Sequence, residues 1–315
     1  MMKLMQKILL TMVLLTALGA CTPPSKQDRE QYLTVSVACD ETFRPIMEQE
    51  MRAFHAKYPE ALLDTAFLPE TDALNLVLQD SLRMVISTRQ FSEQEKQYLM
   101  DKYRLVVESQ PFAYDAIALI INKQNMDSLL SVNELRNILT GKLTQWSEIQ
   151  HAQTKGAVEV VFDNENSSTV RFLRDSLLGG AELKGNLKTA HSNKNVIDYV
   201  RQTRNAIGII GVDWIRNPQD TTNLTFDDHV RVMSLSHSAV TTESNSFLPV
   251  QYYIATKDYP LIRTLYISSI EPYPQALNRN FYFYLTDTEG QLIITKSSQL
   301  LPIVPVQVRR VDVTD

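Results

Sequence analysis

Residues 163–169 read DNENSST, in which two acids precede three consecutive hydroxyl side chains. The apolar segment 157–162 comes before this stretch, and apolar residues recur after it at helical spacing, up to the glycine pair 179–180. The pattern predicts a helix that begins after a cap at Asn166 or Ser167. Unpaired N–H groups and hydroxyls at such a helix start can bind an anion. A plain helix cap is the alternative, and it needs only one Ser, Thr or Asn.

Two other strand-to-helix loops carry polar residues of the same kind. DETFR (40–44) follows an alternating strand at 33–38, and Ser87-Thr88-Arg89 ends the strand pattern RMVIST. Ligands of open α/β sheets bind at the carboxyl ends of the strands, where such loops converge. The three loops therefore predict a shared cleft for a small anion.

The elements that must position these loops alternate between strand and helix patterns. This order predicts α/β lobes with mainly parallel sheets. The continuous apolar run 116–122 is typical of a strand covered on both faces. From Arg231 onward the pattern changes: LPVQYYIAT (248–256) reads as a strand and TEGQLIITKSSQL (288–300) as a helix. About 285 residues after the N-terminal segment are enough for two lobes.

The N-terminal segment reads as a targeting signal rather than as part of the fold. Lys3 and Lys7 precede an apolar run at 8–18 that ends in Leu-Gly-Ala-Cys, which resembles a bacterial lipobox. Residues 1–20 are therefore expected to be a signal peptide, and Cys21 to carry a lipid that anchors the chain in the cell envelope, facing the periplasm or the cell surface. An ordinary secreted protein is the alternative. Residues 21–31 are expected to be a flexible tether.

Composition excludes several classes of function. The net charge is −5, which disfavours nucleic acid as a partner. The five histidines show no metal-ligand spacing, and Cys39 is the only cysteine besides Cys21, so we expect no metal, no cofactor and no intrachain disulfide. Only 9 glycines occur, so a phosphate-binding loop would depend on hydroxyls more than on glycine.

The order of short motifs resembles the PstS-like phosphate-binding proteins of ABC importers, over most of the chain. The motifs are CDETFRPIM…KYPE, ISTRQFSEQE, DAIALIINKQN, TGKLTQWSEI, NAIGIIGVDWI and DYPLIRTLYI. The resemblance implies a two-lobed, type II-like periplasmic-binding-protein fold in which each lobe is a mixed, mainly parallel sheet flanked by helices. It also implies a monomeric solute-binding protein that captures an inorganic oxyanion, phosphate foremost, and delivers it to the permease subunits of an ABC importer.

The resemblance also implies the site residues. DNENSST falls on the family pattern Arg-x-Asp-Gly-Ser-Gly-Thr, so Ser167 and Thr169 match and Ser168 replaces a glycine. The expected oxyanion ligands are Thr42, Phe43, Ser87, Thr88, Arg89, Asn166, Ser167, Ser168 and Thr169, with Asp163, Arg171 and Thr71 as further candidates.

The chain departs from this pattern in its charges. Asp163 stands where the family has its binding arginine, and Thr88 where it has an Asp. A carboxylate beside phosphate costs about 1 kcal/mol in water and more in a dry site. Arg89, Arg171 or Arg44 could compensate for it.

The expected domain limits are 32–113 with 236–315 for lobe 1, and 114–235 for lobe 2, with hinges near 110–114 and 235–251. The same fold could instead bind another ligand, or act as a surface sensor or adhesion lipoprotein without transport. An enzyme would need a pair such as Ser87 or Ser167 with His191 or His229. Because no G-x-S-x-G elbow surrounds either serine, we expect no catalytic residues.

Overall fold

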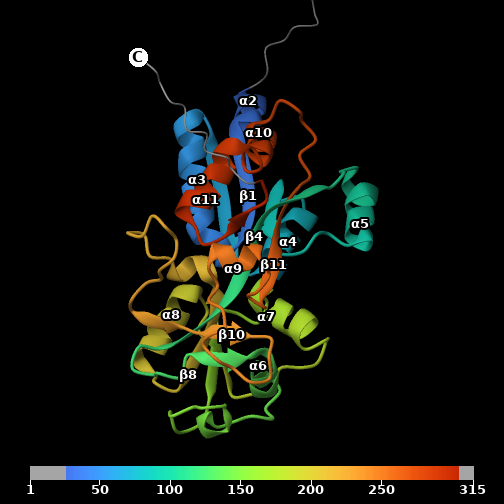
Figure 1. The fold of residues 1–315 in the computed structure, drawn as a ribbon. Helices are drawn as coiled ribbons and strands as arrows, with labels where there is room; N and C mark the ends of the chain where they lie inside the picture. Colours follow the sequence, from blue (N-terminus) through green and yellow to red (C-terminus); the bar gives the residue numbers. More distant parts are fainter. Residues whose placement is uncertain (1–25, 305–315) are drawn as a thin grey trace, which may run out of the picture.

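The computed structural model describes residues 26–304 and consists of two lobes, stacked one above the other in Figure 1. A ten-stranded sheet runs through both, in the order β2-β1-β3-β11-β4-β8-β6-β7, and β9 (Val230–Val232) and β12 (Leu301–Pro302) also pair with β4. We call residues 26–116 and 262–304 the first lobe and residues 117–261 the second lobe.

Strand β4 (Glu108–Asn122) belongs to both lobes. Its first half pairs antiparallel with β11 (Ile262–Ser269), and its second half pairs antiparallel with β8 (Ala206–Gly211). The residues from Ala116 to Ile121 are fully buried, as expected for a strand covered on both faces. One strand therefore holds the two halves of the molecule in register.

The first lobe places helices on both faces of its sheet. Alternation along β1 explains this: Val35, Val37 and Cys39 face one hydrophobic cluster, and Ala38 faces another. The parallel strands are β1 (Thr34–Asp40), β2 (Leu62–Leu68) and β3 (Met84–Ser87). The helices are α2 (Lys26–Leu33), α3 (Arg44–Lys57), α4 (Glu70–Leu78), α5 (Glu93–Tyr103), α10 (Leu277–Tyr284) and α11 (Thr288–Ser297).

The second lobe has one continuous core, which includes Trp146 and the isoleucines of β4 and β8. Its strands are β5 (Leu129–Ser131), β6 (Glu159–Phe162), β7 (Leu187–Thr189), β8, β9 (Val230–Val232) and β10 (Ser234–Ser236). Its helices are α6 (Val132–Leu139), α7 (Ser168–Phe172), which continues as a π-turn over Leu173–Leu177, α8 (Asn193–Gln202) and α9 (Gln251–Ala255). β6 pairs parallel with both β7 and β8.

Two regions differ from the sequence predictions. Residues 248–256 were expected to form a strand but contain α9, because Ile254 packs into the second core and Gln251 bonds the carbonyls of Ser298 and Leu300. Part of the expected tether, from Lys26 onward, is helical in α2. The signal peptide and Cys21 lie outside the described residues.

The expected lobe limit at 235–236 also differs from the packing. Tyr259 and Leu261 belong to the hydrophobic cluster of the second lobe, and the chain joins the sheet of the first lobe only at Ile262. The crossing points of the structure are therefore β4 near Ala116 and the start of β11.

Candidate functional site

The loops that follow β1 and β8 meet where the two lobes face each other. The indole Nε1 of Trp214 donates a hydrogen bond of 2.9 Å to the carbonyl oxygen of Thr42. A Cβ atom added to Gly211 would lie 2.4 Å from Cγ2 of Thr42, so the Thr42 side chain can pack against this backbone only because residue 211 is glycine. The lobes are therefore in contact along this loop.

The loop after β1 presents an unsatisfied hydroxyl to this interface. Asp40 caps the short 3-10 helix Glu41–Phe43 by accepting the N–H of Thr42 at 3.0 Å. The Thr42 side chain is buried, and its Oγ1 has no hydrogen-bond partner. Because buried polar atoms are nearly always paired, this oxygen is a candidate partner for a ligand or an ordered water.

The stretch from Asp163 to Thr169 forms the opposite wall. Ser167 is the helix cap predicted from the sequence, and its Oγ accepts the N–H of Val170 at 3.3 Å. Ser168 and Thr169 are fully buried in the first turn of α7. Both hydroxyls accept from Nη1 of Arg263, Ser168 at 2.9 Å and Thr169 at 3.4 Å.

Arg263, which the sequence prediction did not name, contacts several of the predicted site residues. It lies opposite Asp115 in the antiparallel register of β11 and β4, and its Nε donates to Oδ2 of Asp115 at 2.7 Å. Its guanidinium carbon lies 5.1 Å from the ring centre of Phe43. Both charged residues are buried, yet Nη2 of Arg263 and Oδ1 of Asp115 have no partner. This ion pair is therefore incompletely satisfied at the lobe interface.

Carboxyl groups share the same interior. Burial raises the pKa of Asp163 to about 6, and burial together with repulsion from Glu70 raises the pKa of Asp40 well above its usual range. Asn193 donates to Asp163 at 3.3 Å and to Glu41 of the opposite lobe at 2.6 Å. One oxygen of Asp40 and one of Asp163 are buried without a partner. Asp40 and Asp163 therefore keep their protons to a higher pH than exposed carboxyl groups do.

A second interlobe cluster lies beside this interior. Glu70, at the start of α4, accepts from the backbone N–H and the hydroxyl of Thr88 and from Arg171 of the opposite lobe. Arg171 also donates to Oγ1 of Thr88 at 2.7 Å. Next to it, the N–H of Thr71 lies 3.3 Å from the carbonyl oxygen of Asn166. Arg171, Thr88 and Thr71 therefore bond across the lobes to protein groups.

The other predicted ligands bond within their own loops. Ser87 donates to the carbonyl oxygen of Arg89, and Arg89 forms two hydrogen bonds of 2.8 Å with Glu95. Arg44 lies over the ring of Phe67, with 4.6 Å between the guanidinium carbon and the ring centre. The structure therefore brings together Thr42, Phe43, Asp163, Ser167, Ser168 and Thr169, with Arg263 among them.

Asp115 and Arg263 could have been recognised in the sequence as charges beside apolar strand segments. Asp115 precedes the apolar run of β4, and Arg263 follows the apolar PLI of 260–262. A charge inside a buried strand requires a partner of opposite sign. The sequence shows both charges, but nothing in it says that they lie opposite each other.

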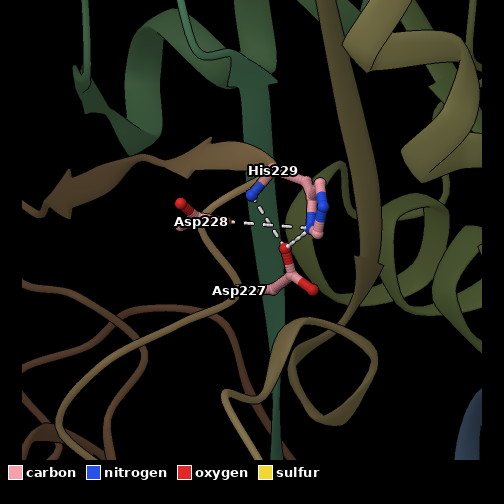
Figure 2. A group of neighbouring side chains, drawn as sticks. All are labelled: Asp227, Asp228 and His229. Carbon is pink, nitrogen blue, oxygen red and sulfur yellow. Dashed lines mark hydrogen bonds and ion pairs between the residues drawn. The ribbon is translucent and has the colours of Figure 1, made fainter.

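The three adjacent residues Asp227, Asp228 and His229 come close enough together to hold a metal ion (Figure 2). Oδ1 of Asp227 contacts Nδ1 of His229 and also accepts the backbone N–H of His229 at 2.8 Å. These contacts are those of a local turn with exposed side chains. They do not in themselves indicate a metal centre.

No helix between residues 26 and 304 combines the length and the apolar character that crossing a bilayer requires.

Comparison with known families supports the resemblance seen in the motifs. A family model described as "PBP superfamily domain" matches residues 24–289. The phosphate-binding protein PstS of Borreliella burgdorferi is 21% identical over 283 residues, which cover 87% of this chain and 91% of that protein.

Solved structures share the two-lobed fold. A phosphate ABC transporter substrate-binding protein from Clostridium perfringens, described as putative and with bound phosphate, superposes with a TM-score of 0.69 at 22% identity, covering 86% of this chain and all of the other. An ABC-type phosphate transport receptor from Vibrio cholerae has a TM-score of 0.59 at 17% identity, covering 83% and 96%. The fold class expected from the sequence is confirmed.

Proposed function

Because the chain belongs to the PBP superfamily, we propose that it is a solute-binding protein that closes its two lobes around an inorganic oxyanion, with phosphate as the ligand. In this proposal it captures phosphate outside the cytoplasm and delivers it to an ABC importer. The names of the relatives support this ligand: the PstS of Borreliella burgdorferi is a phosphate-binding protein, and the Clostridium perfringens structure contains phosphate.

One observation carries the proposal. The buried hydroxyl of Thr42 in the first lobe has no partner, and it faces the lobe that contributes the buried hydroxyls of Ser168 and Thr169. Leaving a buried hydroxyl unsatisfied costs about 1–3 kcal/mol, and an oxyanion that accepts its hydrogen bond removes this cost. A ligand between the two loops would complete the pairing.

The binding event requires no bond to form or break. Donors fixed on rigid loops replace the water around the anion, and opening of the lobes about β4 and β11 releases it. The neutral forms of Asp40 and Asp163 can donate an O–H to the ligand, whereas their ionised forms repel it. The relatives are solute-binding proteins, and we propose that this chain likewise has no catalytic function.

The experiment is calorimetric titration with phosphate. Thr42→Val keeps the volume of the side chain and removes its hydroxyl, and we expect it to weaken binding about 10- to 100-fold. The double variant Ser167→Ala with Thr169→Ala should weaken it by a similar factor or more. Thr221→Val changes an exposed threonine and is the matched control. Unchanged affinity in both site variants would remove the site assignment.

A second candidate is the same fold with a different ligand. The unpartnered oxygens of Asp40 and Asp163 favour it, because a ligand with donor groups would satisfy them. Equilibrium dialysis against phosphate, sulfate and small carboxylates separates the two candidates. Retention of a carboxylate but not of phosphate would select the second one. A protein that retains none of them fits a surface sensor or adhesion role better.

We also propose that Cys21 carries the lipid anchor that the lipobox pattern predicts. Cells expressing the wild-type chain should incorporate labelled palmitate into it and retain it in the membrane fraction. Cys21→Ser should lose the label and release the protein. Release of the wild-type protein without label would contradict the anchor.

A further inference from the structure

We propose that Arg263 supplies the positive charge that binds the oxyanion. This assignment rests on the proposed function. The positive charge of Arg263 would offset the repulsion between the anion and the carboxyl groups in the same interior. Asp163, which follows β6, stands where the related family has its binding arginine, and an ionised Asp163 has the same sign of charge as the ligand.

The burial of Arg263 is unusual for its type. Only 5% of its surface is exposed, and no other lysine or arginine within residues 30–304 is buried. A guanidinium in this position is costly, because removing it and its partner Asp115 from water costs several kcal/mol per ion. An apolar pair would serve the stability of these strands equally well. The retained charge is therefore better explained by a ligand.

The guanidinium is held in a fixed orientation on three sides. Asp115 accepts from Nε at 2.7 Å, and Ser168 accepts from Nη1 at 2.9 Å. The guanidinium carbon lies 5.1 Å from the ring centre of Phe43. Nη2 remains buried without an acceptor. A planar fork with an unused N–H donor matches the oxygens of a tetrahedral oxyanion better than it matches a single neutral acceptor.

Two other arginines near the interface bond to carboxylates: Arg171 pairs with Glu70, and Arg89 pairs with Glu95. Arg44 also has a buried Nε without a partner, but its guanidinium lies over the ring of Phe67 in the first lobe. Arg263 also contacts both walls of the interface, since it extends from the first lobe to Ser168 and Thr169 of the second. An anion bound to it would link the two lobes directly.

The experiment compares phosphate binding by calorimetry in four proteins. Arg263→Gln alone would leave Asp115 buried without its partner, so the main variant is Arg263→Gln with Asp115→Asn, which keeps the pair neutral and of similar size. We expect this double variant to bind phosphate at least 100-fold more weakly. Arg263→Lys keeps the charge but loses the fork, and we expect a loss of at least 10-fold. Arg279→Gln removes a partly exposed arginine that pairs with Glu108 outside the interface, and this variant should bind like the wild type.

A spectroscopic signal tests the contact directly. The Nε–Hε resonance of Arg263, assigned by its absence in the double variant, should shift as phosphate is added to the wild-type protein. Wild-type affinity in the double variant, or an unshifted resonance at saturation, would overturn the role of Arg263 and leave the proposed function intact. No phosphate binding by the wild-type protein would overturn the proposed function, and the assignment of Arg263 with it.

Discussion

Arg171 of the second lobe donates from Nε to Oε2 of Glu70 in the first lobe, with 2.5 Å between the two atoms. The Glu70 side chain is 2% exposed, so this ion pair is largely shielded from water. The partners belong to different lobes, so the proposed opening of the lobes would separate them. We therefore expect the pair to act as a latch on the closed state.

Breaking this latch should weaken ligand binding without changing the ligand contacts. Arg171→Gln leaves the buried carboxylate of Glu70 with only the two donors of Thr88, which raises the free energy of the closed state. We expect phosphate affinity to fall at least 10-fold, a change of about 1.4 kcal/mol. Small-angle X-ray scattering should show a larger radius of gyration at the same phosphate concentration.

The control for the latch is on the same helical segment. Arg174 pairs with its neighbour Asp175 inside the second lobe, so Arg174→Gln removes an equal charge without touching the interface. It should bind and scatter like the wild type. An equal loss of affinity in both variants would mean that net charge, not the latch, controls binding.

Closure should also depend on the absence of a side chain at Gly211. Its added Cβ would lie 2.4 Å from Cγ2 of Thr42, so Gly211→Ala should hold the lobes apart and weaken phosphate binding about 10-fold or more. Thr42→Ser removes that methyl group and keeps the hydroxyl. Affinity measured for the double variant should therefore recover most of the loss. A double variant as weak as Gly211→Ala alone would show that the defect arises elsewhere.

The charge of Asp163 should oppose the anion at alkaline pH. Since burial raises its pKa to about 6, the group is mainly neutral at pH 5 and mainly ionised at pH 8. Asp163→Asn imitates the neutral form, so it should bind phosphate about 10-fold more tightly than the wild type at pH 8 and equally at pH 5. Phosphate itself titrates in this range, but it does so equally for both proteins. The ratio of the wild-type affinity to the Asp163→Asn affinity at each pH is therefore free of this effect. Tighter wild-type binding at pH 8 would contradict this assignment.

A buried acid outside the site should make stability depend on pH. Burial raises the pKa of Glu50 to about 9, and both of its oxygens are buried without a hydrogen-bond partner. The folded state therefore keeps this proton while the unfolded state loses it above a pH of about 4.3. The stabilisation is complete below that pH and is lost as the pH rises towards 9.

Urea unfolding at several pH values measures this effect. From pH 5 to pH 8, Glu50 should lower the free energy of unfolding by about 1.4 kcal/mol per pH unit. Glu50→Gln should remove that slope, whereas Glu48→Gln, an exposed position on the same helix, should keep it. If the free energy of unfolding of Glu50→Gln falls with pH as steeply as that of the wild type, groups other than Glu50 cause the pH dependence.

The sequence by itself determined the local elements and the likeness to a known fold. The alternation in β1, the apolar run of β4 and the cap at Ser167 depend on neighbouring residues, whose spacing is visible in the chain. Motif order added the two-lobed architecture. The short helix α9 was missed because contacts with residues 298–300, not its own aromatic residues, decide its conformation.

Only the tertiary structure decided which polar residues meet. Arg263 and Asp115 are 148 positions apart, and strand register places them opposite each other. Arg171 and Glu70 meet across two lobes, so Arg171 forms an interlobe ion pair although its position suggested a ligand contact. Propensity and spacing act over a few residues, whereas the pairing of buried charges depends on how distant strands align, and that alignment is fixed by the packing of the whole molecule.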